Sequence, residues 1–336
     1  MKINNFDIEK KVMIIAEIGN NHEGNFNIAK DMVKMAADSG ADAVKFQTFC
    51  VDRYVTIKDR ARCEQLKKYE LTYEQFELLA HIAKKNDLIF LSTPFDIESA
   101  DAIESFVPAY KISSGDNTFW PLIEHIARKG KPVLLSTGLT KLHDIEKAVE
   151  IINNNSPISE LKNALVLLHC ISAYPASPND LNLLAIKYLR DHFNILSGYS
   201  DHSMEIISCV AAAAVGARII EKHFTYKKEG QTFKDHLLSA TPQEMKEMVN
   251  QIRVMEKMLG NYQKEPVKSE EQLFVAARRS IAAKKNLTSG MIVKPDDITW
   301  VRPGNGIKPG EEQRVIGQKL SRNIKQGTIF SLEDFE

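Results

Sequence analysis

Two histidines stand near the ends of two short apolar segments of the chain. His202 follows the segment 193–197, and His223 follows the segment 217–220. The residues between them, 205–216, are rich in alanine and typical of a helix, so the pattern predicts strand, helix, strand. In a parallel α/β unit both imidazoles would then lie on the face where such folds bind ligands. Two neutral imidazoles there could bind a divalent metal ion, and the alternative is a pair of unrelated polar loop residues.

Two lysines lie inside otherwise apolar segments that predict strands. Burying an unpaired ammonium group is costly, so Lys45 and Lys111 each require an anionic partner. Glu17 or Asp116 would serve if the pairs are only structural. The functional alternative is a pocket for a small anion with phosphate and carboxylate groups, such as phosphoenolpyruvate. Hydroxyl groups at the predicted strand ends would complete such a pocket: Thr93, Ser113, Ser136 and Ser172.

Other polar side chains follow the same predicted strands. Asp201 precedes His202, and we expect it to orient the imidazole. Cys170 is expected to be a buried, unreactive thiol rather than a nucleophile. Asp235 and His236 follow the last predicted strand, where they either belong to the site or form a salt bridge within a loop.

Strand-like and helix-like segments alternate regularly from Lys11 to about Gly260. The predicted strands are 12–18, 43–48, 88–93, 109–114, 132–136, 164–169, 193–197 and 217–220. The predicted helices are 27–39, 72–86, 97–106, 120–128, 142–152, 180–191, 205–216 and 242–259. Eight strands, each followed by a helix, are typical of a (β/α)8 TIM barrel in the α/β class. A doubly wound sheet is disfavoured because the chain contains no GxGxxG motif.

The pattern changes after Gly260. Residues 261–276 are polar and charged, which predicts a linker. Residues 277–336 contain short β-like pieces broken by Gly, Pro and Asn, at 280–283, 298–301, 319–324 and 327–330. We therefore expect a barrel domain over 1–260 and a small β-rich C-terminal domain.

Composition excludes several classes of protein. The 336 residues are 43% hydrophobic and 26% charged, as in an ordinary globular protein. Lys plus Arg and Asp plus Glu both number 44, so no overall field attracts nucleic acid or an acidic membrane. The four cysteines are scattered and form no CxxC pair. No apolar run is long enough for a membrane span, and the first ten residues lack the apolar core of a signal peptide, so a cytoplasmic location is expected.

The ordered motifs of the chain resemble the sialic acid synthase family, which includes N-acetylneuraminate, legionaminate and pseudaminate synthases. The motifs are IAEIG at 15–19, NHEG at 21–24, VKFQT at 44–48, LSTPF at 91–95, YKISSG at 110–115, LSTG at 135–138, HC at 169–170, AYP at 173–175, GYSDH at 198–202 and EKHF at 221–224. In the tail, RPGNG at 302–306 resembles the small antifreeze-like (SAF) domain of these enzymes.

The resemblance implies an activity and a set of site residues. The family condenses phosphoenolpyruvate with an N-acetylmannosamine-like aldehyde sugar, giving a nine-carbon 2-keto-3-deoxy acid and phosphate. It implies that His202 and His223 bind a divalent metal, Mn²⁺ with Mg²⁺ or Co²⁺ as alternatives. The residues that match the phosphoenolpyruvate pocket are Lys45, Thr93, Lys111, Ser113, Ser136 and Ser172.

The sugar end of the site is implied in the same way. Gln47, Tyr174 and Asp235 match positions near the sugar, while Glu17 and Asp116 match acidic groups of the site. Arg302 matches a residue that a partner subunit places over the sugar's N-acetyl group, which implies a domain-swapped homodimer. The chain departs from many bacterial members at Asp116, where they have Glu, and at 233–235, where Phe-Lys-Asp replaces Gly-Pro-Asp.

Three alternatives remain. The first is a legionaminic or pseudaminic acid synthase that acts on a diacetamido-dideoxy hexose. The second is a related phosphoenolpyruvate-dependent synthase that makes seven- or eight-carbon keto-deoxy acids, which the Arg302 motif disfavours. The third is a sugar-binding protein without catalytic activity, which retention of both lysines and both histidines disfavours.

Overall fold

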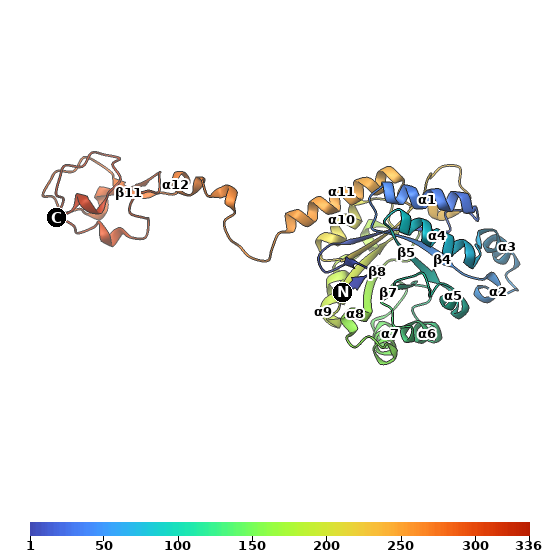
Figure 1. The fold of residues 1–336 in the computed structure, drawn as a ribbon. Helices are drawn as coiled ribbons and strands as arrows, with labels where there is room; N and C mark the ends of the chain where they lie inside the picture. The colour runs from blue at the N-terminus through green and yellow to red at the C-terminus, as the bar shows by residue number, and fades with distance from the viewer. The chain divides into compact units, whose positions relative to one another are not determined.

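The computed structural model describes all 336 residues and divides into two compact units, Met1–Gly260 and Asn261–Glu336. The first unit is a closed barrel of eight parallel strands, joined in the order β10-β3-β4-β5-β6-β7-β8-β9, with the helices around its outside (Figure 1). The strands are β3 Met13–Gly19, β4 Ala43–Thr48, β5 Ile89–Pro94, β6 Tyr110–Ile112, β7 Val133–Ser136, β8 Leu165–Cys170, β9 Ser197–Asp201 and β10 Ile219–His223. The predicted (β/α)8 barrel is confirmed.

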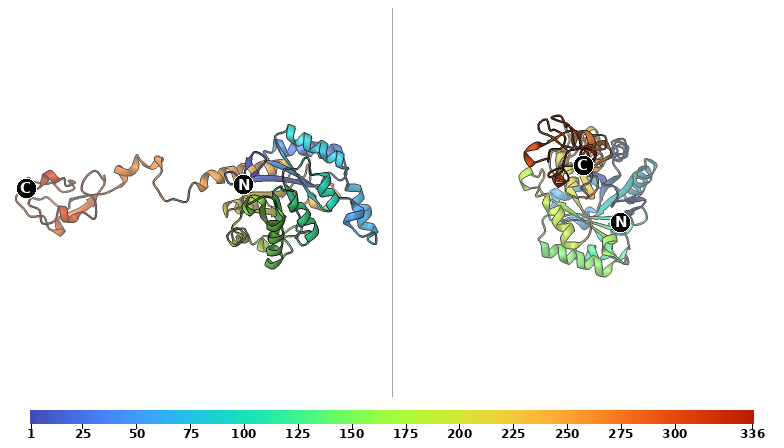
Figure 2. Two further views of the ribbon diagram at one scale, coloured as in Figure 1. Left: turned by 60° about the horizontal axis from the view of Figure 1, so that its bottom comes forward. Right: turned by 90° about the vertical axis from the view of Figure 1, so that its left-hand side faces the viewer.

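Most of the helices bury an apolar face against the outer surface of the barrel (Figure 2). Capping boxes begin two of them, with Thr72 and Gln75 at one start and Thr241 and Glu244 at the other. The helices are α1 Phe26–Asp38, α2 Val51–Tyr54, α3 Arg60–Tyr69, α4 Tyr73–Lys85, α5 Ile97–Ala102, α6 Trp120–Arg128, α7 Leu142–Asn155, α8 Leu161–Ala164, α9 Leu184–Phe193, α10 Ile207–Ala214 and α11 Pro242–Leu259. None of them is long and apolar enough to cross a membrane.

An N-terminal hairpin closes one end of the barrel. Its strands β1 Lys2–Ile3 and β2 Phe6–Asp7 pair antiparallel. Ile3 and Ile8 are fully buried in one apolar cluster with residues that begin the barrel strands, among them Met13 and Ala43. This end is therefore filled with apolar side chains, and only the opposite end, where the strands finish, is available for a site.

Two local predictions are wrong, and two helices in the segment 51–70 were not predicted. The seventh strand lies at Ser197–Asp201 and not at 193–197, because Phe193 ends helix α9 and Asn194 takes a left-handed turn with φ 52°. His223 is the last residue of β10 rather than a residue after the strand. The charged insertion that follows β4 also contains helices α2 and α3, which its weak apolar pattern does not reveal.

Side-chain alternation along β9 and β10 overturns the role expected for Asp201. Tyr199 and Asp201 point away from the barrel axis, whereas Ser200 between them lines the pocket inside. The Asp201 carboxylate consequently makes no hydrogen bond with the His202 imidazole. It forms a 2.7 Å ion pair with Lys222, and both side chains are fully buried between barrel and helices.

The second unit has a small core of its own. Strands β11 Ser280–Ala283 and β12 Ile298–Val301 pair antiparallel, and Ile329 joins β11 through an isolated bridge to Ala282. Two further bridges link Ile324 to Leu287 and Lys319 to Ile292, outside these strands. A buried cluster that includes Ile281, Val315 and Phe330 fills the centre. The segment 261–276, expected to be a linker, contains η3 Lys268–Glu270 and the start of α12 Leu273–Ala277.

The buried ion pair between Asp201 and Lys222 leads to a stability prediction. Replacing Lys222 with Met leaves Asp201 charged and buried without its cationic partner, which is expected to lower the free energy of unfolding by about 3–5 kcal/mol. The measurement is urea denaturation followed by circular dichroism. The matched control is Lys67→Met, which removes an exposed pair with Glu70 and should change stability by less than about 1 kcal/mol. Equal effects of the two substitutions would contradict the prediction.

Candidate active site

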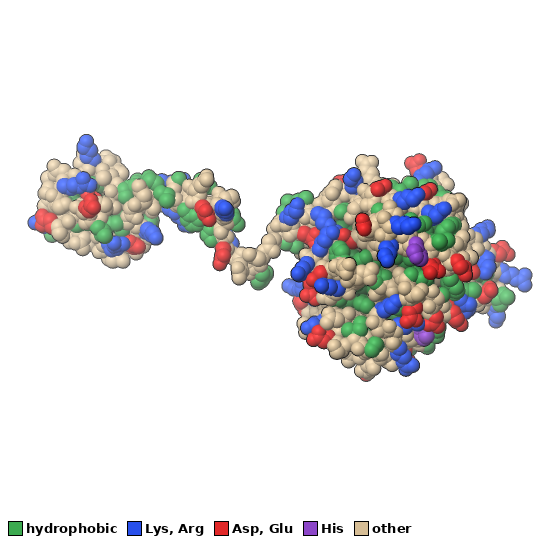
Figure 3. Space-filling view, in the orientation of Figure 1, with side chains coloured by type: hydrophobic (Ala, Val, Ile, Leu, Met, Phe, Trp, Pro, Cys, Tyr) green, Lys and Arg blue, Asp and Glu red, His purple; other side chains and the backbone are tan.

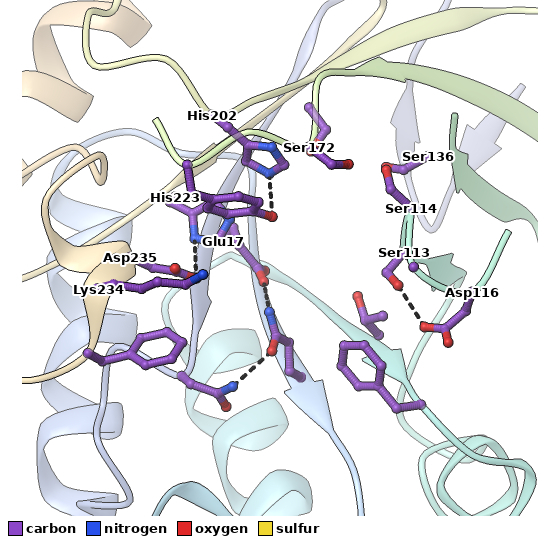
Figure 4. Close-up of a pocket in the computed structure, with 18 of the residues that line it drawn as sticks. Glu17, Ser113, Ser114, Asp116, Ser136, Ser172, His202, His223, Lys234 and Asp235 are labelled. Atoms are coloured by element: carbon purple, nitrogen blue, oxygen red, sulfur yellow. Dashed lines mark hydrogen bonds and ion pairs between the residues drawn. The ribbon is translucent and has the colours of Figure 1, made fainter. Parts of the chain in front are cut away.

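A cavity of about 1070 Å³ opens at the end of the barrel where the strands finish. Figure 4 shows side chains from several strands and loops pointing into it. Among the residues predicted for the site, all those in the barrel unit line this cavity: Glu17, Lys45, Gln47, Thr93, Lys111, Ser113, Asp116, Ser136, Ser172, Tyr174, His202, His223 and Asp235. Arg302 lies in the second unit, and its proximity to any pocket stays a prediction.

Four buried charges form the floor of the cavity. Lys45 Nζ lies 2.9 Å from Glu17 Oε2 and 3.7 Å from Glu221 Oε2, and Lys111 Nζ lies 3.9 Å from Glu221 Oε1. Glu221 therefore stands between the two lysines. Asp116, the alternative partner considered from the sequence, instead accepts a 2.6 Å hydrogen bond from Ser113.

Burial and the opposite charges act against each other in this cluster. Burial alone would raise the pKa of Glu221, but Lys111 and Lys45 outweigh it and hold that pKa below the ordinary value. Burial raises the pKa of Glu17, because Lys45 offsets it only in part and Glu221 repels the second negative charge. The pKa of Lys45 is raised by Glu17 and Glu221 against the effect of burial, whereas burial lowers the pKa of Lys111. Of the two carboxylates in this cluster, Glu17 is thus better suited than Glu221 to accept a proton.

Hydroxyl groups surround the two ammonium groups. Lys45 donates to Thr93 Oγ1 at 2.9 Å, and Lys111 donates to Ser136 Oγ at 2.7 Å. Ser172 Oγ is buried without a hydrogen-bond partner, so it is free for a ligand. Ammonium and hydroxyl donors gathered around one cavity can bind phosphate and carboxylate groups.

The two imidazoles lie beside each other on one side of the cavity, with ring centroids 5.3 Å apart. His202 Nδ1 lies 2.7 Å from the carbonyl of Ile171. Because a carbonyl only accepts, Nδ1 carries a proton, and Nε2 lies 2.9 Å from the Tyr174 hydroxyl. For His223, burial lowers the pKa well below its ordinary value, so its imidazole is neutral.

These imidazoles fit a divalent metal as a pair of ligands. No group of three His, Cys, Asp or Glu side chains forms a complete metal site. His223 Nδ1, however, is buried without a hydrogen-bond partner and lies 3.8 Å from Asp235 Oδ2. A buried lone pair without a donor is costly, and a metal ion would satisfy it together with His202 Nε2. The remaining ligands would be water or substrate.

The sequence reasoning missed several residues of the cavity. Glu221 was identified only as part of the EKHF motif, although it precedes His223 by two positions and so shares its face of the strand. Ser200 donates to Glu221 Oε1 at 2.9 Å, and Ser114 accepts from the Gly138 amide at 3.1 Å. The same two-residue period along β9 would have identified Ser200.

The chain matches known proteins over nearly its whole length. Residues 32–264 match the NeuB family and residues 278–336 match the SAF domain. N,N'-diacetyllegionaminic acid synthase of Legionella pneumophila is 40% identical, over 96% of this chain and 94% of its own length. N-acetylneuraminate-9-phosphate synthase of Homo sapiens is 31% identical, over 93% and 89%. The crystal structure of an N-acetylneuraminic acid synthetase from Leptospira borgpetersenii in complex with citrate has a TM-score of 0.76 and 35% identity, covering 81% of this chain and 94% of that one.

The lysines of the floor lead to a binding prediction. Lys111→Met removes one cation but leaves Glu221 paired with Lys45. A hydrogen bond to a charged group contributes about 1.5–3 kcal/mol, so the affinity for phosphoenolpyruvate should fall about 10- to 150-fold. Isothermal titration calorimetry measures this affinity. Lys187→Met, on the exposed side of α9, serves as the control, and an unchanged affinity of the Lys111 variant would contradict the prediction.

Proposed function

The chain belongs to the NeuB family, and we propose that its cavity joins phosphoenolpyruvate to an N-acetylmannosamine-like aldehyde sugar. The protein is an enzyme, a sialic-acid-type synthase whose product is a nine-carbon 2-keto-3-deoxy acid, with phosphate released. One observation carries the proposal: the cavity contains the buried charges of Glu17, Lys45, Lys111 and Glu221 beside two imidazoles, those of His202 and His223. The ammonium groups of Lys45 and Lys111 line the cavity together with hydroxyl donors, and such donors suit a substrate with phosphate and carboxylate groups.

The reaction forms one carbon–carbon bond and breaks one carbon–oxygen bond. Carbon 3 of phosphoenolpyruvate attacks the aldehyde carbon, water adds to carbon 2, and the bond from carbon 2 to the phosphate oxygen then breaks. Lys45 and Lys111, with the hydroxyls beside them, would hold the phosphate and carboxylate in place for this attack. Glu17 would accept the proton of the added water, because its pKa is raised by burial.

We propose that His202 and His223 hold a divalent ion, Mn²⁺ in the first place, with Mg²⁺ or Co²⁺ as alternatives. Such an ion would act as a Lewis acid toward the aldehyde oxygen. The Tyr174 hydroxyl, now 2.9 Å from His202 Nε2, would give up that contact and become available to the sugar. Asp235 Oδ1, which is buried without a hydrogen-bond partner, lies on the same side of the cavity as His223 and would accept a hydrogen bond from a sugar hydroxyl.

The oligomeric state is part of the proposal. The segment that opens the second unit exposes apolar side chains, with Leu273 at 59% and Val275 at 54%. Such exposure is typical of a surface that another subunit covers. We propose a domain-swapped homodimer in which Arg302 of a second copy completes the sugar end of the cavity. A cytoplasmic location also stays a prediction.

The activity can be tested with a panel of sugars. Phosphate release from phosphoenolpyruvate should depend on an added aldehyde sugar, and mass spectrometry should detect the nine-carbon acid made with N-acetylmannosamine. A product from diacetamido-dideoxy hexoses alone would identify a legionaminic or pseudaminic acid synthase instead. Absence of phosphate release with every sugar, under conditions where phosphoenolpyruvate binds, would indicate a protein that only binds its ligands.

The metal role has its own test. Removing divalent ions with a chelator should abolish phosphate release, and added Mn²⁺ should restore it. The variant His202→Ala/His223→Ala should stay inactive when Mn²⁺ is added, and should also lose Mn²⁺ binding measured by calorimetry. The control is His81→Ala, which changes an exposed imidazole on α4. Full turnover by the double variant would overturn the metal assignment.

A further inference from the structure

The sequence motif Asn21-His22-Glu23-Gly24 follows β3, and no step of the proposed reaction uses it. Its backbone is unusual, because Glu23 has φ 48° and Gly24 has φ 77°. A left-handed conformation is unfavourable for a residue with a side chain such as Glu and persists only where the surroundings demand it. The position of this turn is also tightly confined, since a Cβ on Gly24 would lie 1.8 Å from the carbonyl oxygen of Lys68 in α3.

The Glu23 side chain holds the loop that follows β10. Its Oε1 accepts hydrogen bonds from the Thr232 amide at 2.8 Å, the Thr232 hydroxyl at 2.9 Å and the Phe233 amide at 2.8 Å. His236 Nε2 lies 3.6 Å from the same oxygen. These amide and hydroxyl bonds, against the effect of partial burial, hold the pKa of Glu23 below its ordinary value, so the carboxylate is charged at neutral pH.

Asn21 fastens the two ends of the same loop. Its amide donates to the carbonyl of Phe224, where β10 ends, and to Ser239 Oγ, just before α11, both at 2.8 Å. Between these ends the loop is held in the middle by Glu23. The Phe233 ring then packs against Tyr69 of α3, with centroids 5.2 Å apart.

The loop held in this way supplies one wall of the cavity. Thr232, Phe233, Lys234 and Asp235 all line it. In Figure 4, Lys234 and Asp235 lie on the same side as His223, across the cavity from Ser113, Ser114 and Ser136. The Lys234 ammonium stands 5.4 Å from the centre of the Tyr174 ring. The hydroxyl side suits the phosphate and carboxylate, so the loop side receives the other substrate.

We propose that Glu23 is a positioning residue that holds the 225–241 loop as the sugar-binding wall, and so governs affinity for the sugar and not for phosphoenolpyruvate. The inference rests on the proposed function for its substrate and on the contacts above for its geometry. Glu23 touches neither substrate. It acts through Phe233 and Asp235, because no other charged side chain of the loop after β3 binds this segment.

The test compares Glu23→Ala, Glu23→Gln and the control Glu77→Ala, an exposed carboxylate on α4. Loss of the charged acceptor should raise the KM for the sugar about tenfold or more and leave the KM for phosphoenolpyruvate within about twofold. Glu23→Gln retains an acceptor oxygen, so it should recover part of the affinity. Glu77→Ala should have the same two KM values as the wild-type protein.

Hydrogen–deuterium exchange supplies a readout that needs no activity. In Glu23→Ala the amides of peptides covering 228–236 should exchange about tenfold or more faster, while those of the barrel strands keep their rates. Unchanged exchange of this loop, or equal rises in both KM values, would overturn the proposal. If the unchanged protein releases no phosphate with any sugar, the proposed function fails, and the exchange rates alone still decide whether Glu23 holds the loop.

Discussion

The structure of the site depends on burying four charges, Glu17, Lys45, Glu221 and Lys111, at the bottom of one cavity. Each ion alone would cost several kcal/mol to remove from water, so each requires an opposite charge beside it. Four different strands supply the four residues, namely β3, β4, β6 and β10. Only a closed barrel brings these strand positions around a single axis. The need for charge compensation therefore ties the site to the completeness of the fold.

The faces of the strands divide the polar residues between two tasks. Along β10, Glu221 and His223 face the cavity, while Lys222 between them faces the helices and pairs with Asp201. The charged side chains that face the cavity are accessible to ligands, whereas the Asp201–Lys222 pair is fully buried and stabilises the fold. On the face of the barrel unit drawn in Figure 3, acidic and basic side chains are interspersed.

The segments that follow the strands form the rim of the cavity. The turn after β3, the helix α3 after β4 and the loop after β10 contact one another through Glu23, Gly24 and the Tyr69–Phe233 pair. A second small apolar cluster, which includes Phe49, Val51 and Tyr69, supports them at the rim. These segments are distant in the chain. Their mutual contacts are what give the rim of the cavity a defined shape.

The sequence by itself determined the barrel, the C-terminal β-rich domain and many of the polar residues that line the cavity. Alternating apolar periodicities and polar groups at strand ends are local signals, so Lys45, Lys111, His202 and the hydroxyl residues were all recognisable from them. The tertiary structure alone decided the pairings. Glu221 rather than Asp116 compensates Lys111, and Asp201 turns outward to Lys222 instead of supporting His202. Such choices follow from strand register and side-chain direction around a closed barrel, and a shift of one residue reverses every side chain.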